Sequence, residues 1–234
     1  MIGLPKQNTL PLFPLNTVVF PGGRLPLRIF EQRYLDMIKQ AIANDTPFGI
    51  CAPAWGTPVG ALKDSDPLWA EAHVESYAPP LRGDPSAAIR EGAETGSPAE
   101  PHDVGTCMRI TDWDMPQTGI LHIETVALER FVIRSTYTEP NGLLMGMVED
   151  VSVEPPAPIP DDLELPIEIL RHIIGEYGNA HFPEPHELDN AVWVGYRLSE
   201  VLPLTLSIQQ NLLEMNDSVM RLRILTEFLK KQIN

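Results

Sequence analysis

Prolines interrupt strand-like apolar runs near the start of the chain, and this pattern limits the fold more than any other feature. Pro11, Pro14, Pro21 and Pro26 fall within the first thirty residues. Proline cannot donate a hydrogen bond to a β-ladder, so it is confined to edges, strand starts and bulges. Between the prolines, apolar residues recur at a spacing of two, as in a half-buried strand, at Leu25, Leu27 and Ile29. The pattern predicts a bent, strongly curved sheet with a tight turn at 21–23.

The hydrophobic period changes directly after this region. Tyr34, Leu35, Ile38 and Ile42 recur at the three-to-four spacing of an amphipathic helix. A negative charge is favourable at a helix N-terminus, which agrees with a start near Glu31. We therefore expect one early helix inside a strand-rich region.

Further strand-like runs follow at 48–51 and 107–110. The residues at 120–126 and 130–137 are predicted to form neighbouring antiparallel strands, joined by a tight connection at 127–129. The run at 143–153 would close the sheet. Short, twisted strands joined mainly by turns are typical of a small, partly closed barrel.

The second half of the chain reads as helical. Residues 154–162 are rich in proline and predict a stiff, extended linker. Helices are expected at 163–177 and 188–201, then a third capped by Ser207 and a fourth capped by Asp217. The predicted division is 1–153 for the β-rich part, 154–162 for the linker and 163–234 for a helical bundle. An insertion without periodicity is expected at about 52–88.

The net charge and the cysteine content limit the classes of function that we expect for this chain. The chain has 234 residues, a formal net charge of -15 and a hydrophobic content of 43%. So acidic a chain is not expected to bind nucleic acid or anionic lipid through general electrostatics. Cys51 and Cys107 are expected to be buried free thiols, because no metal-ligand or C-x-x-C spacing accompanies them. The absence of a signal peptide and of an apolar span predicts a cytoplasmic protein.

Patterns that carry chemistry are missing from the sequence. There is no Gly-Lys dipeptide, so a phosphate-cradling P-loop is excluded, and none of G-x-S-x-G, H-E-x-x-H or G-x-G-x-x-G occurs. His181 and His186 flank two prolines and lack a third ligand nearby, which favours a structural loop over a metal site. We therefore predict no catalytic residue, no cofactor and no metal.

Several motifs together carry a family resemblance. The N-terminal run spans residues 10–34, with PLFPL, FPG and PLRIFE followed by Arg33 and Tyr34. VGTCMRI at 104–110 and ERFVI at 129–133 follow, and YRLSEVLPL, QNLLE and RLRIL lie toward the end. This combination resembles the substrate-binding N-terminal domain of the Lon protease family. The resemblance covers nearly the whole chain apart from the fifties to the eighties.

The resemblance implies an α+β fold, in which a PUA-like curved β-barrel with one early helix precedes a C-terminal helical bundle. Full-length relatives are ATP-driven peptidases, but this sequence lacks their nucleotide-binding and serine-lysine motifs. We therefore expect a stand-alone, non-catalytic polypeptide-binding module, either an adaptor or a chaperone-like protein in protein quality control. Its expected partners are unfolded or partly folded polypeptides, with a protease or chaperone as a further candidate.

Five residues are candidate peptide contacts, each with ordinary surface placement as the alternative. Gln32, Arg33 and Asp36 lie on the expected exposed side of the first helix. Trp113 and Met115 are expected in a loop before the strand at 120. Exposed apolar groups or an open strand edge could hold a peptide without ATP.

Two other functions remain open at this point. PUA domains bind RNA, and Arg24, Arg28 and Arg33 form the only dense basic group in the sequence. The acidic balance of the chain argues against an RNA-binding module. A cryptic hydrolase is the other alternative, although no motif supports one.

Overall fold

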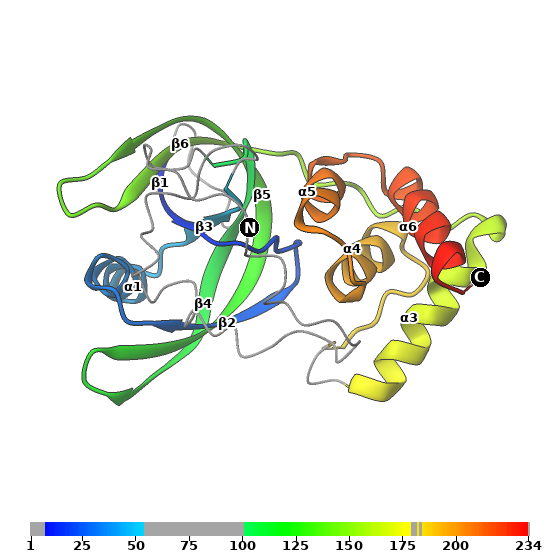
Figure 1. The fold of residues 1–234 in the computed structure, drawn as a ribbon, viewed down its shortest axis with the longest axis horizontal. Helices are drawn as coiled ribbons and strands as arrows, with labels where there is room; N and C mark the ends of the chain where they lie inside the picture. Colours follow the sequence, from blue (N-terminus) through cyan, green and yellow to red (C-terminus); the bar gives the residue numbers. More distant parts are fainter. Residues whose placement is uncertain (1–7, 54–100, 179–181, 183, 234) are drawn as a thin grey trace. The chain divides into compact units, whose positions relative to one another are not determined.

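The computed structural model describes residues 8–53, 101–178, 182 and 184–233. The chain divides into two compact units, Met1–Val151 and Ser152–Asn234. The first unit is built on a sheet and the second on helices, which confirms the predicted α+β class (Figure 1). The predicted insertion lies outside the described residues, apart from its first two positions, and its boundaries remain a prediction.

The β-rich unit contains one sheet of six strands in the order β2-β5-β4-β3-β1-β6. β6 pairs with β5 as well as with β1, so the last strand of this order returns to the second one. β1 and β3 run parallel, and every other described pair is antiparallel. The strands are β1 (Asn8–Pro14), β2 (Arg24–Ile29), β3 (Phe48–Cys51), β4 (Val104–Gln117), β5 (Ile120–Thr138) and β6 (Leu144–Asp150).

β2 has the predicted alternation. Leu25, Leu27 and Ile29 are buried, while the residues between them are more exposed. The predicted turn before β2 is also present, with Gly22 at a φ of 81°. The Gly23 N–H donates to the carbonyl of Phe20 across this turn at 2.9 Å. Glycine suits this turn because residues with a Cβ rarely adopt a positive φ.

β5 corrects the prediction of two short strands joined at 127–129. It is one strand of 19 residues, whose first part pairs with β2 and whose last part pairs with β6. Ala127 sits where the connection was predicted. Its N–H donates to the Gly23 carbonyl at 2.8 Å, and its carbonyl accepts from the Gly22 N–H at 2.9 Å. The turn before β2 thus provides the hydrogen-bond partners of the β5 backbone at Ala127, and the strand continues.

α1 (Gln32–Asn44) is the expected early helix, with Glu31 as its N-cap residue. Its buried face carries Tyr34, Leu35 and Ile38, which belong to one apolar cluster with residues of β2, β3 and β5. The Tyr34 ring stacks on Phe13 with the ring centroids 4.0 Å apart. Burial of this apolar face, at roughly 25 cal/mol per Å² of surface removed from water, is what holds the helix on the sheet.

A second apolar cluster surrounds Phe131 and includes both cysteines. A Cβ at Gly105 would lie 2.5 Å from the Phe131 ring and 2.5 Å from the Ile50 carbonyl oxygen. Only glycine permits this close approach of β3, β4 and the ring. The packing explains why the VGT motif has a glycine in the middle of a strand.

The helical unit contains a short 3-10 turn and four described α-helices. They are η2 (Asp161–Leu163), α3 (Glu164–Tyr177), α4 (Ala191–Val201), α5 (Leu206–Glu214) and α6 (Ser218–Ile233). Pro166 lies in the first turn of α3, where a missing N–H has little cost. α4 packs against both α5 and α6, so it forms the centre of the unit.

Two predicted helix starts are wrong by a few residues, and the caps explain both. α4 begins at Ala191 and not at 188, because the Asn190 side chain accepts a hydrogen bond from the Val192 N–H. Thr205 caps α5 in place of the predicted Ser207, and its hydroxyl accepts from the Ile208 N–H. The predicted Asp217 cap of α6 is confirmed, since its carboxylate accepts from the Met220 N–H at 2.9 Å.

A buried ion pair fixes the start of the helical unit to its last helix. Arg221 is fully buried on α6, and its Nη2 lies 2.6 Å from Glu154 Oε1. Arg221 also donates to the carbonyls of Leu212 and Met215. Its guanidinium covers the Tyr196 ring, whose hydroxyl donates to Glu154. The side chain therefore ties together α4, α5, α6 and the segment that the sequence predicts as a linker.

Candidate functional site

The three predicted contacts on α1 are mostly occupied with local bonds. Gln32 is exposed, and its side-chain amide donates to Asp36 at 2.7 Å. Arg33 bonds to Glu31 at 2.8 Å and to the Gly142 carbonyl at 3.0 Å, and it lies over the Tyr34 ring. Arg33 therefore links α1 to the β5–β6 connection, and its charge is already partly neutralised.

Trp113 and Met115 lie in β4, which corrects the prediction of a loop. Pairing with β5 is the physical reason, because Trp113 is in register with Ile123 there. Both side chains remain exposed, at 52% for Trp113 and 42% for Met115. Among the described residues, no hydrogen bond or ion pair joins either one to Gln32, Arg33 or Asp36. The five candidates thus lie on two elements, α1 and β4.

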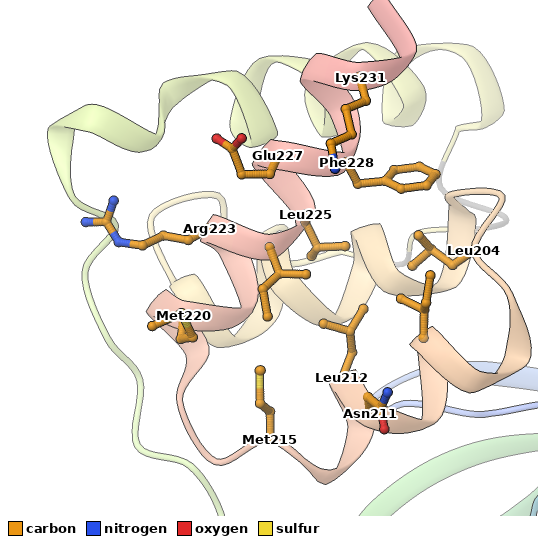
Figure 2. A pocket seen from close by; sticks show the side chains of 12 residues that line it. Leu204, Asn211, Leu212, Met215, Met220, Arg223, Leu225, Glu227, Phe228 and Lys231 are labelled. Carbon is orange, nitrogen blue, oxygen red and sulfur yellow. The ribbon is translucent and has the colours of Figure 1, made fainter.

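A hollow with an apolar lining lies in the helical unit, between α5 and α6 (Figure 2). We call it the α5–α6 groove. Its volume is about 550 Å³, within the range of about 300–1,000 Å³ typical of ligand pockets. The lining residues are Leu204, Ile208, Asn211, Leu212, Met215, Met220, Arg223, Ile224, Leu225, Glu227, Phe228 and Lys231.

α6 carries two apolar stripes, one buried in the helical unit and one that lines the groove. Leu222, Leu225 and Leu229 are buried in the unit. A second stripe, formed by Met220, Ile224 and Phe228 at a spacing of four, lines the groove. Met220 is 48% exposed and Ile224 is 37% exposed. The helix is thus apolar over a wider arc than its own core requires.

α4 explains why the two helices leave a groove between them. Both α5 and α6 pack on α4, and only a short segment at 215–217 connects them. Ile208 on α5 is 36% exposed and lines the same groove. Apolar side chains from two helices therefore face a shared, solvent-open space (Figure 2).

Charged groups border the groove, and most of them are paired. Arg223 Nη1 lies 2.6 Å from Asp162 Oδ2, and this bond lowers the pKa of the Asp162 carboxyl. Lys230 lies 2.9 Å from Glu227. Lys231 also lines the groove and is exposed. These side chains suit the rim of a binding surface whose interior is apolar.

The side chains that line the groove suit the binding of an apolar partner. No serine, threonine, cysteine or histidine is among its lining residues. Met215 and Met220 are flexible and polarizable, which allows them to fit apolar partners of different shape. The sequence contained a signal for this site, because the second stripe on α6 is visible in the spacing of Met220, Ile224 and Phe228. The groove itself could not be predicted from the sequence, because it depends on where α5 lies beside α6.

The two cysteines and His186 are held in structural surroundings. Cys51 and Cys107 are free and buried. Burial raises the pKa of the Cys51 thiol to about 12 and raises that of Cys107 as well, and a buried protonated thiol is a poor nucleophile. His186 bonds to the Phe182 carbonyl, whereas His181 lies outside the described residues. Within the described ranges, no group of metal-ligating side chains and no helix able to span a membrane occurs.

Comparison with known proteins agrees with this picture. A family model for the ATP-dependent protease La (LON) substrate-binding domain matches residues 9–231. The crystal structure of a Lon N-terminal domain protein from Xanthomonas campestris is similar, with 26% identity and a TM-score of 0.66 over 94% of this chain and 98% of that one.

A more distant structure has the same fold. The N-terminal domain of Mycobacterium avium complex Lon protease is 16% identical, with a TM-score of 0.54 over 94% of this chain and 97% of that one. No curated protein matches the chain. The family match over nearly every residue, together with the α+β architecture, confirms the resemblance seen in the sequence motifs. The chain belongs to the LON substrate-binding domain family.

Proposed function

We propose that this chain recognises exposed apolar segments of unfolded or partly folded polypeptides and does not cut them. The observation that carries the proposal is the α5–α6 groove, an apolar and solvent-open surface in a member of a substrate-binding family. Unfolded chains differ from folded ones chiefly in the apolar surface that they expose. Such a role corresponds to an adaptor or a chaperone-like protein in protein quality control.

The volume and composition of the groove favour a short apolar segment as its occupant. Exposed apolar side chains at Ile208, Met220 and Ile224 can each lose contact with water when a segment binds. Arg223 and Lys231 are placed where their aliphatic stems can cover the bound segment, with their charges in water. Asn211 adds an amide that can bond to a peptide backbone.

A charge placed in the groove tests the proposal. Fluorophore-labelled β-casein serves as the unfolded probe, and its anisotropy is followed as the full chain is added. We expect saturable binding that weakens at least about tenfold in Ile224→Asp, because the new carboxylate must lose water against apolar groups. The control is Val153→Asp, which changes another exposed apolar side chain that does not line the groove.

Three results would remove the proposal. They are no binding of β-casein by the wild-type chain, equal weakening by both substitutions, or cleavage of the probe by a preparation whose activity survives further purification. If the groove is instead covered by a second copy of the chain, light scattering will report a dimer that dissociates in Ile224→Asp, and the proposal also fails.

A further inference from the structure

β4 extends beyond the strand that pairs with one of its sides. β3 pairs with residues 106–108 of β4, whereas β5 accompanies β4 as far as Gln117. In the part of the chain that the structure describes, no strand pairs with this side of β4 after Met108. We call residues 109–117 of β4 the outer edge. The hairpin that they form with β5 extends away from the rest of the sheet at the lower left of Figure 1.

One face of the outer edge is apolar. Trp113 is in register with Ile123 of β5, and Ile123 is in turn in register with Leu27 of β2. Ile123 and Leu27 are buried, but Trp113 is half exposed because it is the last residue of this cross-strand row, with no described strand beyond it. Met115 lies two residues further along the strand and is also exposed. The apolar face of the sheet therefore reaches the solvent at this edge.

The opposite face of the outer edge carries two aspartates near its centre. Asp112 is in register with Glu124, and Asp114 is in register with His122. Both aspartates are exposed. The Asp112 carboxylate accepts a hydrogen bond from the Trp113 N–H at 2.9 Å, which holds this negative charge against the main chain of the strand. From Asp112 to Met115 the edge thus alternates between acidic and apolar side chains.

We propose that the outer edge of β4 binds an extended polypeptide segment as an additional β-strand, and that it selects alternating basic and apolar side chains. This inference rests on the proposed function, since it names a second polypeptide site and its preference. An added strand gains main-chain hydrogen bonds from an open edge, and its side chains face those of the strand beside it. Lysine or arginine then meets Asp112 and Asp114, while apolar residues cover Trp113 and Met115.

Charge argues for this occupant over a second copy of the chain. An antiparallel pair of two outer edges centred on Trp113 would place Asp112 of one copy opposite Asp114 of the other, and like charges directly opposite are destabilising. A basic segment is instead attracted by the net charge of -15. Pro116 lacks an N–H and limits the new ladder to the residues before it.

Peptide probes test the main-chain and side-chain parts separately. We expect the full chain to bind a labelled peptide of alternating lysine and valine, and to bind its glutamate counterpart at least about tenfold more weakly. Two further peptides carry N-methyl groups on alternate amides, in opposite phases. Binding should be lost in the phase that blocks the amides facing β4 and retained in the other. Equal binding of both phases would overturn the proposal.

Matched variants locate the site. Asp112→Asn/Asp114→Asn should weaken binding of the lysine peptide about three- to tenfold and reduce its dependence on salt. Glu168→Gln/Asp189→Asn makes the same change in net charge at exposed positions of the helical unit and should have no effect. Equal effects of the two double variants would mean that the preference for the lysine peptide comes from the net charge of the chain, and this would overturn the proposal.

The two polypeptide sites can fail independently. Asp112→Asn/Asp114→Asn should leave β-casein binding unchanged, and Ile224→Asp should leave binding of the lysine peptide unchanged. If β-casein binds through the α5–α6 groove while the lysine peptide does not bind, the strand proposal falls and the proposed function stands. If neither probe binds, both fall. Slow hydrogen exchange of the Met115 amide in the unbound chain would show an occupied edge and would also overturn the strand proposal.

Discussion

Arg221 and Arg223 are two residues apart on α6, yet their ion pairs have very different surroundings. The Arg221 side chain is 0% exposed and its partner Glu154 is 6% exposed, whereas the Arg223 and Asp162 side chains are 46% and 60% exposed. Water screens the second pair, but the first has no water to replace a lost partner. Burial, and not the distance between the charged atoms, decides which pair matters for stability.

We predict that Glu154→Gln lowers the free energy of unfolding by about 3–5 kcal/mol, because it leaves the Arg221 charge buried without its carboxylate. Asp162→Asn removes the exposed partner of Arg223 and should leave the free energy of unfolding nearly unchanged. Urea titrations followed by circular dichroism measure both. A similar loss in the two variants would mean that the burial of Arg221 is not the deciding factor.

The two buried thiols predict a loss of stability at alkaline pH. Burial raises the pKa of Cys51 from 9.0 to about 12, and the pKa of Cys107 is also raised. Above pH 9 the unfolded chain releases these protons while the folded chain keeps them, so the folded state binds more protons and its stability falls as pH rises. Below pH 9 both states hold the protons and the effect is absent.

We expect the free energy of unfolding to fall between pH 9 and about 12 by on the order of 1 kcal/mol per pH unit for each thiol. Urea titrations with a reductant present, at several pH values, measure the slope. Cys51→Ala/Cys107→Ala loses stability at every pH through its cavities, but its slope should be smaller. An unchanged slope would assign the alkaline loss to other groups.

At the scale of elements, local sequence patterns predicted most of the secondary structure. β2 and α1 followed from hydrophobic spacing, because each buries one face against the same core. β3 followed from its short apolar run, since all four of its residues are buried. β5 did not, since nothing in the residues at 127–129 reveals that the turn at Gly22 and Gly23 bonds to the backbone of Ala127. Contacts distant in sequence overrode the local turn signal.

The candidate sites show the same limit of local reasoning. Asp112, Asp114 and Pro116 are residues that strands disfavour, so the sequence around Trp113 reads as a loop. Pairing with β5 makes it a strand and turns an isolated tryptophan into one face of an open edge. On α6 the second apolar stripe was present in the sequence, but its role depends on the position of α5 across the groove. The positions of β5 and α5 in the fold define these two candidate sites, and residue type and spacing alone do not reveal them.

At the scale of the whole molecule, charge separates polypeptide recognition from RNA recognition. The chain has 32 acidic and 17 basic residues. RNA binding depends strongly on the number of cationic side chains that meet phosphates. Of the basic group noted in the sequence, Arg33 is bonded to Glu31 and to a carbonyl. Arg24 and Arg28 remain on β2, on the face that also carries Glu124 of the adjacent strand.

We therefore predict no saturable binding of a single-stranded RNA oligonucleotide, even at about 50 mM salt, where phosphate contacts are strongest. Fluorescence anisotropy of a labelled oligonucleotide measures this, with the lysine peptide as a positive control for the same preparation. Saturable binding that weakens steeply with added salt would contradict the prediction. Arg24→Gln/Arg28→Gln would then decide whether β2 carries the binding, because removing two phosphate contacts reduces the dependence on salt in proportion to the charges lost.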